Sequence, residues 1–500
     1  MTKQEALDLL LGKLGDSKAF NTALSLIHWD AMVSGVPEKS ISARGAAEGW
    51  LGMESFKRMM APETLEAIET LEAHKSELTE TEQAMVRVLG RSYRKAKAVP
   101  PEEFGTFRAL VAESNQVWEK AREKCDYEMM QPYYEKVFDY QRKLCDWYGY
   151  EKHPYDALLD DYEIGANVEM LDGFFAALRK EIVPLLKEIT SKSEKPAEIS
   201  GNFDINKQRE LLPWLADFTG YDRERGKVGE VEHPFCMTVN RHDVRITTKY
   251  HEDSLSSAIY SIIHECGHGI YEQNMSEELD PYGLAECASM GMHESQSRLY
   301  ENMIGRSKPY AERLLPKLQE KFDYFKNWDA EKLYRAANVA KPSLIRIEAD
   351  ELTYSLHIMV RYELEKGLLE GNLKVSDLPT LWSDKYAEIL GIRPQNLAEG
   401  VLQDVHWGLG LVGYFPSYAV GTAYGAQMMH FIKSKANIDV DAAIRKENLS
   451  PVTGWLKENI HEKGSLYLPD ELLKKATGEK FNPQYYVDYL KEKFTGLYLA

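Results

Sequence analysis

The sequence predicts a mainly α-helical fold with one small antiparallel β-sheet. Apolar residues recur at helical spacing through most of the chain, whereas β-branched residues gather in one pair of short runs between residues 233 and 248. With 500 residues, of which 44% are hydrophobic and 28% charged, the chain has an ordinary globular composition and enough length for a large core. We therefore expect a large helical protein with a single β region.

The first third of the chain is predicted to be helical. Three segments have apolar positions at helical spacing, namely residues 4–14, 17–33 and 44–60. Thr79 and Glu82 form a candidate capping box for the next helix, and Pro100-Pro101 marks a break before a long helical pattern that continues to about residue 148. The polar segment 191–201 predicts a loop, which is either a joint between subdomains or a surface loop within one domain.

The β region is a predicted hairpin. Residues 233–240 and 241–248 are joined by a polar turn, and the edge of such a hairpin could align an extended peptide as an additional strand. From Asp253 onward the pattern is helical again, and it ends with two helices that begin near Pro469 and Asn482.

The motif His264-Glu265-Cys266-Gly267-His268 lies just after this hairpin. Two histidines four residues apart lie on one face of a helix, where both can bind one metal ion with Glu265 beside it. A random chain of this composition would contain about 0.03 such patterns. Apolar flanking residues predict a buried helix, on which these polar side chains need partners. Cys266, about 200° round the helix from His264, is predicted to pack.

A third metal ligand is expected downstream, because a catalytic zinc ion usually has three protein ligands and one open position. Glu294 is the favoured candidate, since the residues after His268 suffice to end one helix, turn and return on a second. His293 is the alternative. A helix can present only one of two adjacent residues at the metal, and we favour the carboxylate.

The second half of the chain resembles the carboxypeptidase Taq family of zinc-dependent metallocarboxypeptidases. Six segments resemble its signatures in order: His233-Pro234-Phe235, Asp243 to Thr247, His264 to His268, His293 to Gln296, Ile345 to Asp350, and Gly400 to Trp407. Six ordered signatures over about 175 residues are far more specific than one metal-binding pentapeptide. Residues 1–200 resemble the family mainly in helical character and length.

The resemblance implies a metal site and a general base. His264, His268 and Glu294 would hold Zn²⁺, for which Co²⁺ is a possible substitute, and Glu265 would take a proton from the attacking water and later protonate the leaving amine. Some peptidases with this motif have an aspartate four residues after the glutamate ligand. Here that residue is Arg298, so another acid is expected to orient a ligand histidine, with Asp350 or Asp404 as the candidates.

The resemblance also implies residues that contact the substrate. Arg346 would bind the terminal carboxylate in a bidentate fork, although it could instead form a surface ion pair on its own helix. Further substrate-binding candidates are Arg245, which could instead pair with Asp243 on its strand, and Gln403, which could instead support neighbouring residues. We expect His406 and Tyr418 to donate hydrogen bonds to the oxyanion, with two other tyrosines, Tyr414 and Tyr424, as alternatives to Tyr418.

The predicted fold is one domain, residues 1–500, of the large helical zinc-peptidase type. It has possible halves 1–200 and 201–500, a deep central cleft between them, and the small sheet beside the metal-binding helix. The predicted reaction is release of single C-terminal amino acids from peptides with broad specificity. An oligopeptidase or dipeptidyl carboxypeptidase of the same architecture is the alternative. An inactive zinc-binding protein is disfavoured, because a purely structural site needs no base beside an open coordination position.

The net charge of −18 argues against nucleic acid or an anionic membrane as a partner. The expected partners are peptides with a free C-terminus, and the family resemblance implies a homodimer. The first residues lack the apolar core of a signal peptide, and the five unclustered cysteines fit reduced thiols. We therefore expect a cytoplasmic protein.

Overall fold

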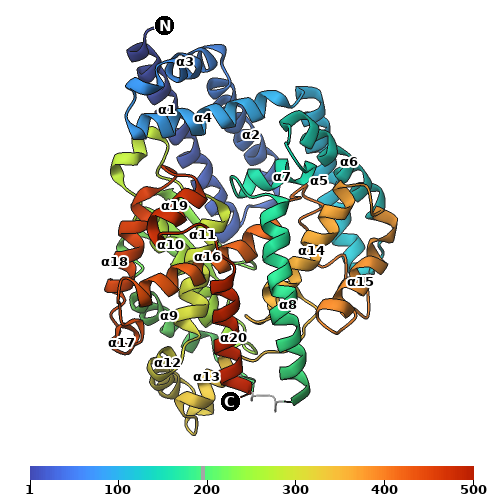
Figure 1. The fold of residues 1–500 in the computed structure, drawn as a ribbon, viewed down its shortest axis with the longest axis vertical. Coiled ribbons are helices and arrows are strands. Elements are labelled where there is room, and N and C mark those ends of the chain that lie inside the picture. The colour runs from blue at the N-terminus through green and yellow to red at the C-terminus, as the bar shows by residue number, and fades with distance from the viewer. Residues whose placement is uncertain (193–197, 500) are drawn as a thin grey trace.

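The computed structural model describes residues 1–192 and 198–499, and helices form most of it (Figure 1). The helices before the sheet are α1 (Lys3–Trp29), α2 (Ile41–Met59), α3 (Pro62–Ala73), α4 (Glu80–Ala98), α5 (Pro101–Lys124), α6 (Gln131–Tyr148), α7 (Pro154–Tyr162), α8 (Val168–Lys192) and α9 (Ile205–Thr219). Those after it are α10 (Leu255–Gln273), α11 (Met290–Arg298), α12 (Lys308–Lys321), α13 (Ala330–Ala337), α14 (Tyr354–Leu369), α15 (Leu378–Ile389), α16 (Phe415–Ser434), α17 (Val440–Arg445), α18 (Ser450–Asn459), α19 (Pro469–Thr477) and α20 (Gln484–Tyr498).

The N-terminal helices agree with the prediction in type and differ in their ends. The segments predicted at 4–14 and 17–33 form one helix, α1, which continues as a π-helical turn to Ser34. The long pattern predicted to reach residue 148 is two helices, because α5 ends at Cys125 in a left-handed conformation with φ of 52°. The capping box is confirmed: the Glu82 N–H donates to Thr79 Oγ1 at 3.2 Å, and the Thr79 N–H donates to Glu82 Oε2 at 2.7 Å.

The sheet has three strands in the order β1-β3-β2. The predicted hairpin is confirmed as β2 (Cys236–Asn240) paired antiparallel with β3 (Asp243–Thr248). A third strand, β1 (Val228–Glu230), pairs parallel with β3, so the sheet is mixed rather than purely antiparallel. Three residues are too short for a recognisable alternation of apolar and polar side chains, so the sequence pattern did not predict β1. The predicted loop at 191–201 falls partly on residues 193–197, outside the described residues.

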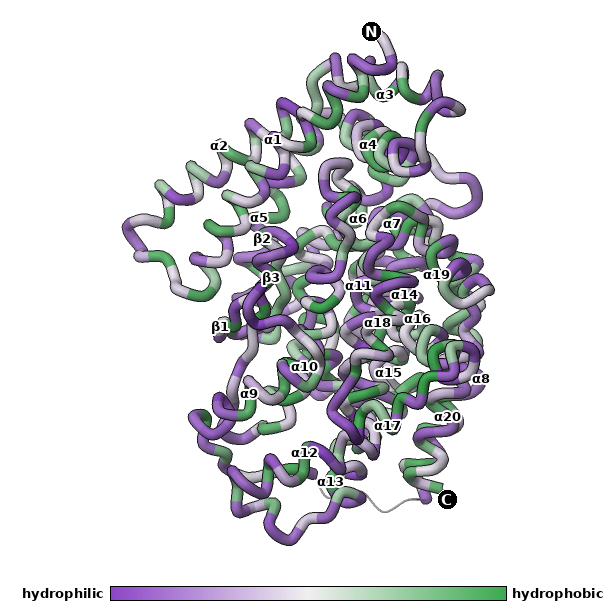
Figure 2. The backbone as a smooth tube through the Cα atoms, turned by 90° about the vertical axis from the view of Figure 1, so that its left-hand side faces the viewer, coloured by the Kyte–Doolittle hydropathy of each residue, from purple (hydrophilic) through white to green (hydrophobic). Residues whose placement is uncertain are grey.

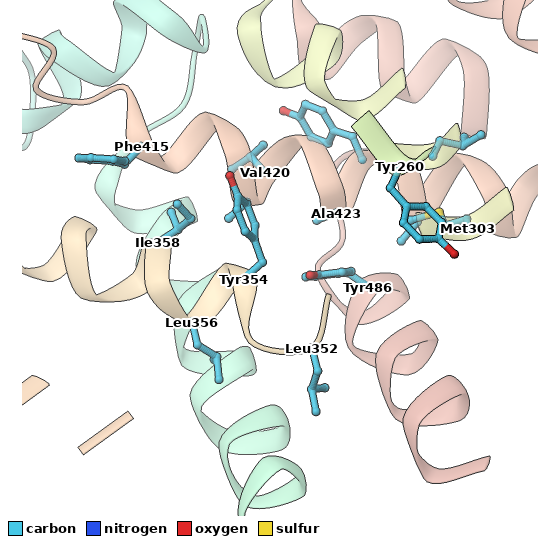
Figure 3. Packing of buried hydrophobic residues seen from close by; sticks show 14 of the residues in the cluster. Tyr260, Met303, Leu352, Tyr354, Leu356, Ile358, Phe415, Val420, Ala423 and Tyr486 are labelled. Atoms are coloured by element: carbon cyan, nitrogen blue, oxygen red, sulfur yellow. The ribbon is translucent and has the colours of Figure 1, made fainter. Parts of the chain in front are cut away.

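The main hydrophobic core draws its buried residues from Ala121 to Leu497, so it includes helices on both sides of residue 200. Figure 3 shows part of it, where residues of α14, α16 and α20 pack together. In the described parts of the chain, no helix has the length and apolar character needed to cross a membrane.

The hairpin of α1 and α2 is much less buried than this core. Between residues 11 and 60, Trp29 is the one buried residue, and α2 has none. Figure 2 shows these two helices along one edge of the molecule. The outward side chains of α2 include Trp50, Met53 and Phe56, which are 64%, 54% and 53% exposed.

Candidate metal and substrate site

The candidate site forms where α10 and α11 cross at close range. A Cβ atom added to Gly267 of α10 would lie 2.7 Å from the Cα atom of Ser297 on α11, so this glycine permits the close contact. On the other side of α11, a Cβ atom at Gly421 of α16 would lie 2.7 Å from the Gly291 carbonyl oxygen. Helix α11 is therefore held between two helices at glycine contacts.

The crossing brings His264 and His268 of α10 next to Glu294 of α11. The Oε2 atom of Glu294 is 3.6 Å from His264 Nε2 and 3.4 Å from His268 Nε2, and the three ligand atoms all lie within 4.8 Å of one another. Ligand atoms at about 2.1 Å from a tetrahedral zinc ion are about 3.4 Å apart, so these residues fit such an ion. Among the described residues, this is the one group of three such side chains close enough to hold a metal.

Glu301 fixes the orientation of His264. It lies on the π-helical segment η6 (Leu299–Gly305) that continues α11, and its Oε2 atom is 2.9 Å from His264 Nδ1. An N–H at Nδ1 that donates to this carboxylate leaves the Nε2 lone pair free for a metal. Glu301 also forms ion pairs with Arg298 at 3.2 Å and Arg306 at 3.1 Å.

The prediction of Asp350 or Asp404 for this orienting role is wrong. Asp350 accepts a hydrogen bond from the Thr353 hydroxyl at 2.7 Å, and Asp404 lies between two arginines. No local sequence signal would have found Glu301, because its position opposite His264 depends on how the π-helical segment η6 continues α11.

Glu265 is buried beside the two histidines, with 6% of its surface exposed. Burial raises its pKa to about 7, although the neighbouring His264 acts in the opposite direction. Its Oε2 atom has no hydrogen-bond partner among the described residues. A buried carboxyl group that titrates near neutral pH and has an unused oxygen is suited to accept and return a proton.

His293, the alternative third ligand, lies outside this cluster. Its Nε2 atom is 3.1 Å from Glu272 Oε1, and its ring stacks on His268 at 4.2 Å between ring centroids. Burial and the adjacent His293 lower the pKa of His268 to about 3, so His268 is neutral, the state that a metal ligand requires.

Arg346 is buried in an ion-pair network and is not at the helix surface. Its Nε and Nη2 atoms each lie 3.0 Å from Asp404 Oδ1, and its Nη1 atom donates to the Tyr354 hydroxyl at 3.2 Å. Asp404 also pairs with Arg361, which is fully buried. The alternative of an exposed ion pair on its own helix is therefore wrong for Arg346.

Gln403 supports this network. Its Oε1 atom accepts hydrogen bonds from the Arg346 backbone N–H at 3.0 Å and from Arg361 Nη2 at 2.8 Å, and its Nε2 atom donates to the Glu399 carbonyl at 2.7 Å. Arg245 on β3 pairs with both oxygens of Asp243, at 2.8 and 2.6 Å. The structure thus places both predicted substrate-binding residues in internal hydrogen bonds.

His406 lies beside Tyr418, with 3.5 Å between Nε2 and the hydroxyl oxygen. Burial lowers the pKa of His406 to about 4, so the imidazole is neutral at pH 7 and can donate one hydrogen bond. The ring of Tyr414 packs edge-on against Tyr418, with centroids 5.2 Å apart. Tyr424 instead donates to Glu163 at 2.9 Å, which separates it from this group.

Known proteins are similar to this chain over nearly its whole length. The family model described as carboxypeptidase Taq (M32) metallopeptidase matches residues 10–494. Carboxypeptidase 1 of Bacillus subtilis is 41% identical over 486 residues, which cover 96% of each protein. Thermostable carboxypeptidase 1 of Pyrococcus furiosus is 36% identical, over 98% of this chain and 99% of the relative.

A solved structure agrees with this result. The crystal structure of an M32 carboxypeptidase from Deinococcus radiodurans superposes with a TM-score of 0.94 at 31% identity, over 99% of this chain and 100% of that one. The predicted helical metallopeptidase fold is confirmed. The chain therefore belongs to the carboxypeptidase Taq (M32) family of metallopeptidases and is a metallocarboxypeptidase.

Proposed function

We propose that this metallocarboxypeptidase uses zinc, held by His264, His268 and Glu294, to release single amino acids from the C-terminus of peptides. The observation that carries the proposal is the cluster of these three side chains beside the buried carboxyl of Glu265, whose Oε2 atom has no hydrogen-bond partner in the described part of the chain. Two imidazoles and one carboxylate with an open fourth position are a donor set typical of catalytic zinc.

Each residue of the cluster has a proposed chemical task. Zinc, when bound, supplies a Lewis acid that polarises the scissile carbonyl group. Glu265 takes a proton from the attacking water and returns it to the leaving amine, which its buried position beside the two histidines allows. Glu301 keeps the His264 ring in the orientation that ligation requires.

Arg346 is the proposed partner of the substrate's terminal carboxylate. A guanidinium group binds a carboxylate in a planar, bidentate arrangement, which suits recognition of a free C-terminus. Asp404 already accepts hydrogen bonds from two nitrogens of Arg346, so the substrate would share or displace these contacts.

Neutral His406 and Tyr418 are the proposed donors to the oxyanion, because their donor groups lie side by side.

Product size tests this function. A peptide with a blocked N-terminus and a free C-terminus is incubated with the zinc-loaded enzyme, and the first products are identified by mass spectrometry. We expect single amino acids. Dipeptides as first products would instead establish the alternative, a dipeptidyl carboxypeptidase, and internal fragments an oligopeptidase.

Two variants in the same assay test the residue roles. Glu265→Gln removes the base and is expected to retain zinc while losing turnover by several orders of magnitude. Arg346→Ala is expected to raise KM strongly for peptides with a free C-terminus. An active Glu265→Gln enzyme, or an unchanged KM for Arg346→Ala, would remove that residue from the proposed site.

We further propose that the protein is a cytoplasmic homodimer in which α2 of one copy packs on α2 of the other. Support comes from the exposed apolar face of α2, which also carries Gly45 and Gly49 with no atom within 4 Å of an added Cβ atom. In an antiparallel pair centred on Gly49, Met53 of one copy would lie opposite Gly45 of the other, so large side chains meet small ones on both sides.

The proposed cytoplasmic location is supported by the five free cysteines, which fit a reducing compartment.

A further inference from the structure

Arg298 lies between the two carboxylates of the candidate metal site. Its Nε atom donates to Glu294 Oε1 at 2.7 Å, and its Nη1 atom donates to Glu301 Oε2 at 3.2 Å. One guanidinium group therefore holds both the predicted ligand Glu294 and the acid that orients His264. The Arg298 side chain is 15% exposed, so little water competes for these contacts.

The two oxygens of Glu294 consequently differ in their surroundings. Oε2 faces the Nε2 atoms of His264 and His268, at 3.6 and 3.4 Å. Oε1 is taken by Arg298. The Ser297 hydroxyl, which is 3.2 Å from Oε2, has its shorter contact with the Glu294 carbonyl oxygen at 2.7 Å, so Oε2 has no competing strong donor among the described side chains.

Tyr354 fixes the plane of the Arg298 guanidinium. The Cζ atom of Arg298 lies 4.2 Å from the centroid of the Tyr354 ring, and the Tyr354 hydroxyl accepts from Arg346 Nη1 at 3.2 Å. Figure 3 shows Tyr354 at the start of α14, packed among residues of α14 and α16. Stacking and a forked pair of hydrogen bonds require arginine, because the ammonium group of lysine is a compact charge without a planar face.

We propose that Arg298 is a positioning residue that makes Glu294 a one-oxygen metal ligand. A carboxylate that binds through both oxygens occupies two coordination positions, whereas one held at Oε1 offers only Oε2. Arg298 thereby preserves an open position at the metal. The inference rests on the zinc site proposed above and adds a role for the residue that stands four positions after Glu294.

The first test uses the wild-type enzyme. X-ray absorption and a crystal structure of the zinc-loaded protein should show one oxygen of Glu294 at about 2.0 to 2.2 Å from zinc. Two Glu294 oxygens at bonding distance would overturn the inference and leave the zinc site intact. A wild-type protein that binds no zinc would refute the site and the inference together.

The second test compares Arg298→Lys and Arg298→Met with Arg306→Met. Arg306 is a matched control, because it also pairs with Glu301 and stacks on a tyrosine but has no hydrogen bond to Glu294. In both Arg298 variants we expect a zinc affinity 10- to 100-fold lower in chelator competition, and a weaker visible spectrum of the Co²⁺-substituted protein because its coordination number rises.

The Arg306→Met protein should keep the wild-type Co²⁺ spectrum. The proposal would be overturned if Arg298→Lys kept the wild-type spectrum and zinc affinity. It would also be overturned if Arg306→Met changed the spectrum and the affinity as much as the Arg298 variants do, because the loss of any buried positive charge would then explain the effect. Circular dichroism of the metal-free proteins identifies folded variants. If Arg298→Met does not fold, the conservative Arg298→Lys protein and the wild-type structure decide the outcome.

Discussion

Glu163 is a buried acid that serves the site without lying in it. It is 3% exposed, accepts from the Gly291 backbone N–H at 2.9 Å, and accepts from the Tyr424 hydroxyl at 2.9 Å. Gly291 is in the first turn of α11, three residues before Glu294. Burial raises the pKa of Glu163 to about 7, against the opposing effect of these hydrogen bonds.

This raised pKa predicts a pH-dependent contribution to stability. The folded protein keeps the Glu163 proton up to about pH 7, whereas the unfolded chain loses it near pH 4.5, so the wild-type contribution falls as pH rises through this window. Glu163→Gln mimics the protonated acid. Its stability relative to wild type should therefore increase between pH 4.5 and 7.5, by about 1 to 3 kcal/mol.

Urea unfolding of the metal-free proteins at several pH values measures this difference. Tyr424→Phe is the control, because it removes one partner of Glu163 and keeps the titrating group. Parallel stability curves for wild type and Glu163→Gln would contradict the raised pKa.

At the residue scale, the sequence predicted that His264, His268 and Glu294 lie close together, but it did not predict the residues that hold them in place. The spacing of His264 and His268 determines one helix face, so their proximity follows from helical geometry. The contact between Glu301 and His264 depends on how η6 continues α11. Tyr424 lies apart from His406 and Tyr418 because it donates a hydrogen bond to Glu163, which is distant in the sequence. Neither is encoded in local spacing.

Among the secondary-structure elements, the glycine contact between α10 and α11 is critical for the site. The sequence motif contains Gly267 between the two histidines, and an added Cβ atom there would lie 2.7 Å from backbone Cα of Ser297 and 2.8 Å from the Gln296 carbonyl oxygen. Backbone atoms cannot rotate away as a flexible side chain can, so the two helices would have to separate.

We predict that Gly267→Ala destabilises the protein by about 1 to 3 kcal/mol and lowers zinc affinity, because His264 and His268 move away from Glu294. The matched control is Gly173→Ala in α8, where no atom lies within 4 Å of the added Cβ atom. That change should stabilise the helix by about 0.5 to 1 kcal/mol. Urea unfolding and chelator competition measure both effects, and an alanine at 267 that retains both properties would refute the close crossing.

Element types were predictable from the sequence, and their ends were less so. Thr79 was recognised as an N-cap because its capping box is local. The end of α5 at Cys125 was missed, because a left-handed cap on a non-glycine residue has no common sequence signal. The strand β1 gains its pairing from β3, so it depends on tertiary structure.

At the scale of the whole molecule, the proposed dimer depends on the exposed apolar face of α2. We predict that Met53→Glu combined with Phe56→Glu converts the dimer to a monomer in sedimentation analysis, since each copy would bury two charges in the interface. Tyr150→Glu, which replaces another exposed aromatic residue, should leave the dimer intact. A wild-type monomer would refute the homodimer, and a dimer that survives the double change would refute only the α2 interface.

The net charge of −18 argues against nucleic acid and anionic membranes as partners, but net charge carries no information on which face of the protein meets a partner. The apolar face of α2 can be recognised as exposed only when the structure shows which face of this helix packs against the rest of the protein. The division into halves 1–200 and 201–500 stays a prediction, and the main core combines residues from both sides of that boundary.

The distribution of the site along the chain has a consequence for the cell that makes the enzyme. His264 and His268 are local to one helix, but Glu294, Arg346, His406 and Tyr418 follow over the next 150 residues, and the core that supports them extends to Leu497. A chain still emerging from the ribosome therefore lacks both the complete metal site and the residues proposed to bind substrate. The proposed site can therefore form only after synthesis has passed these residues and the chain has folded around them.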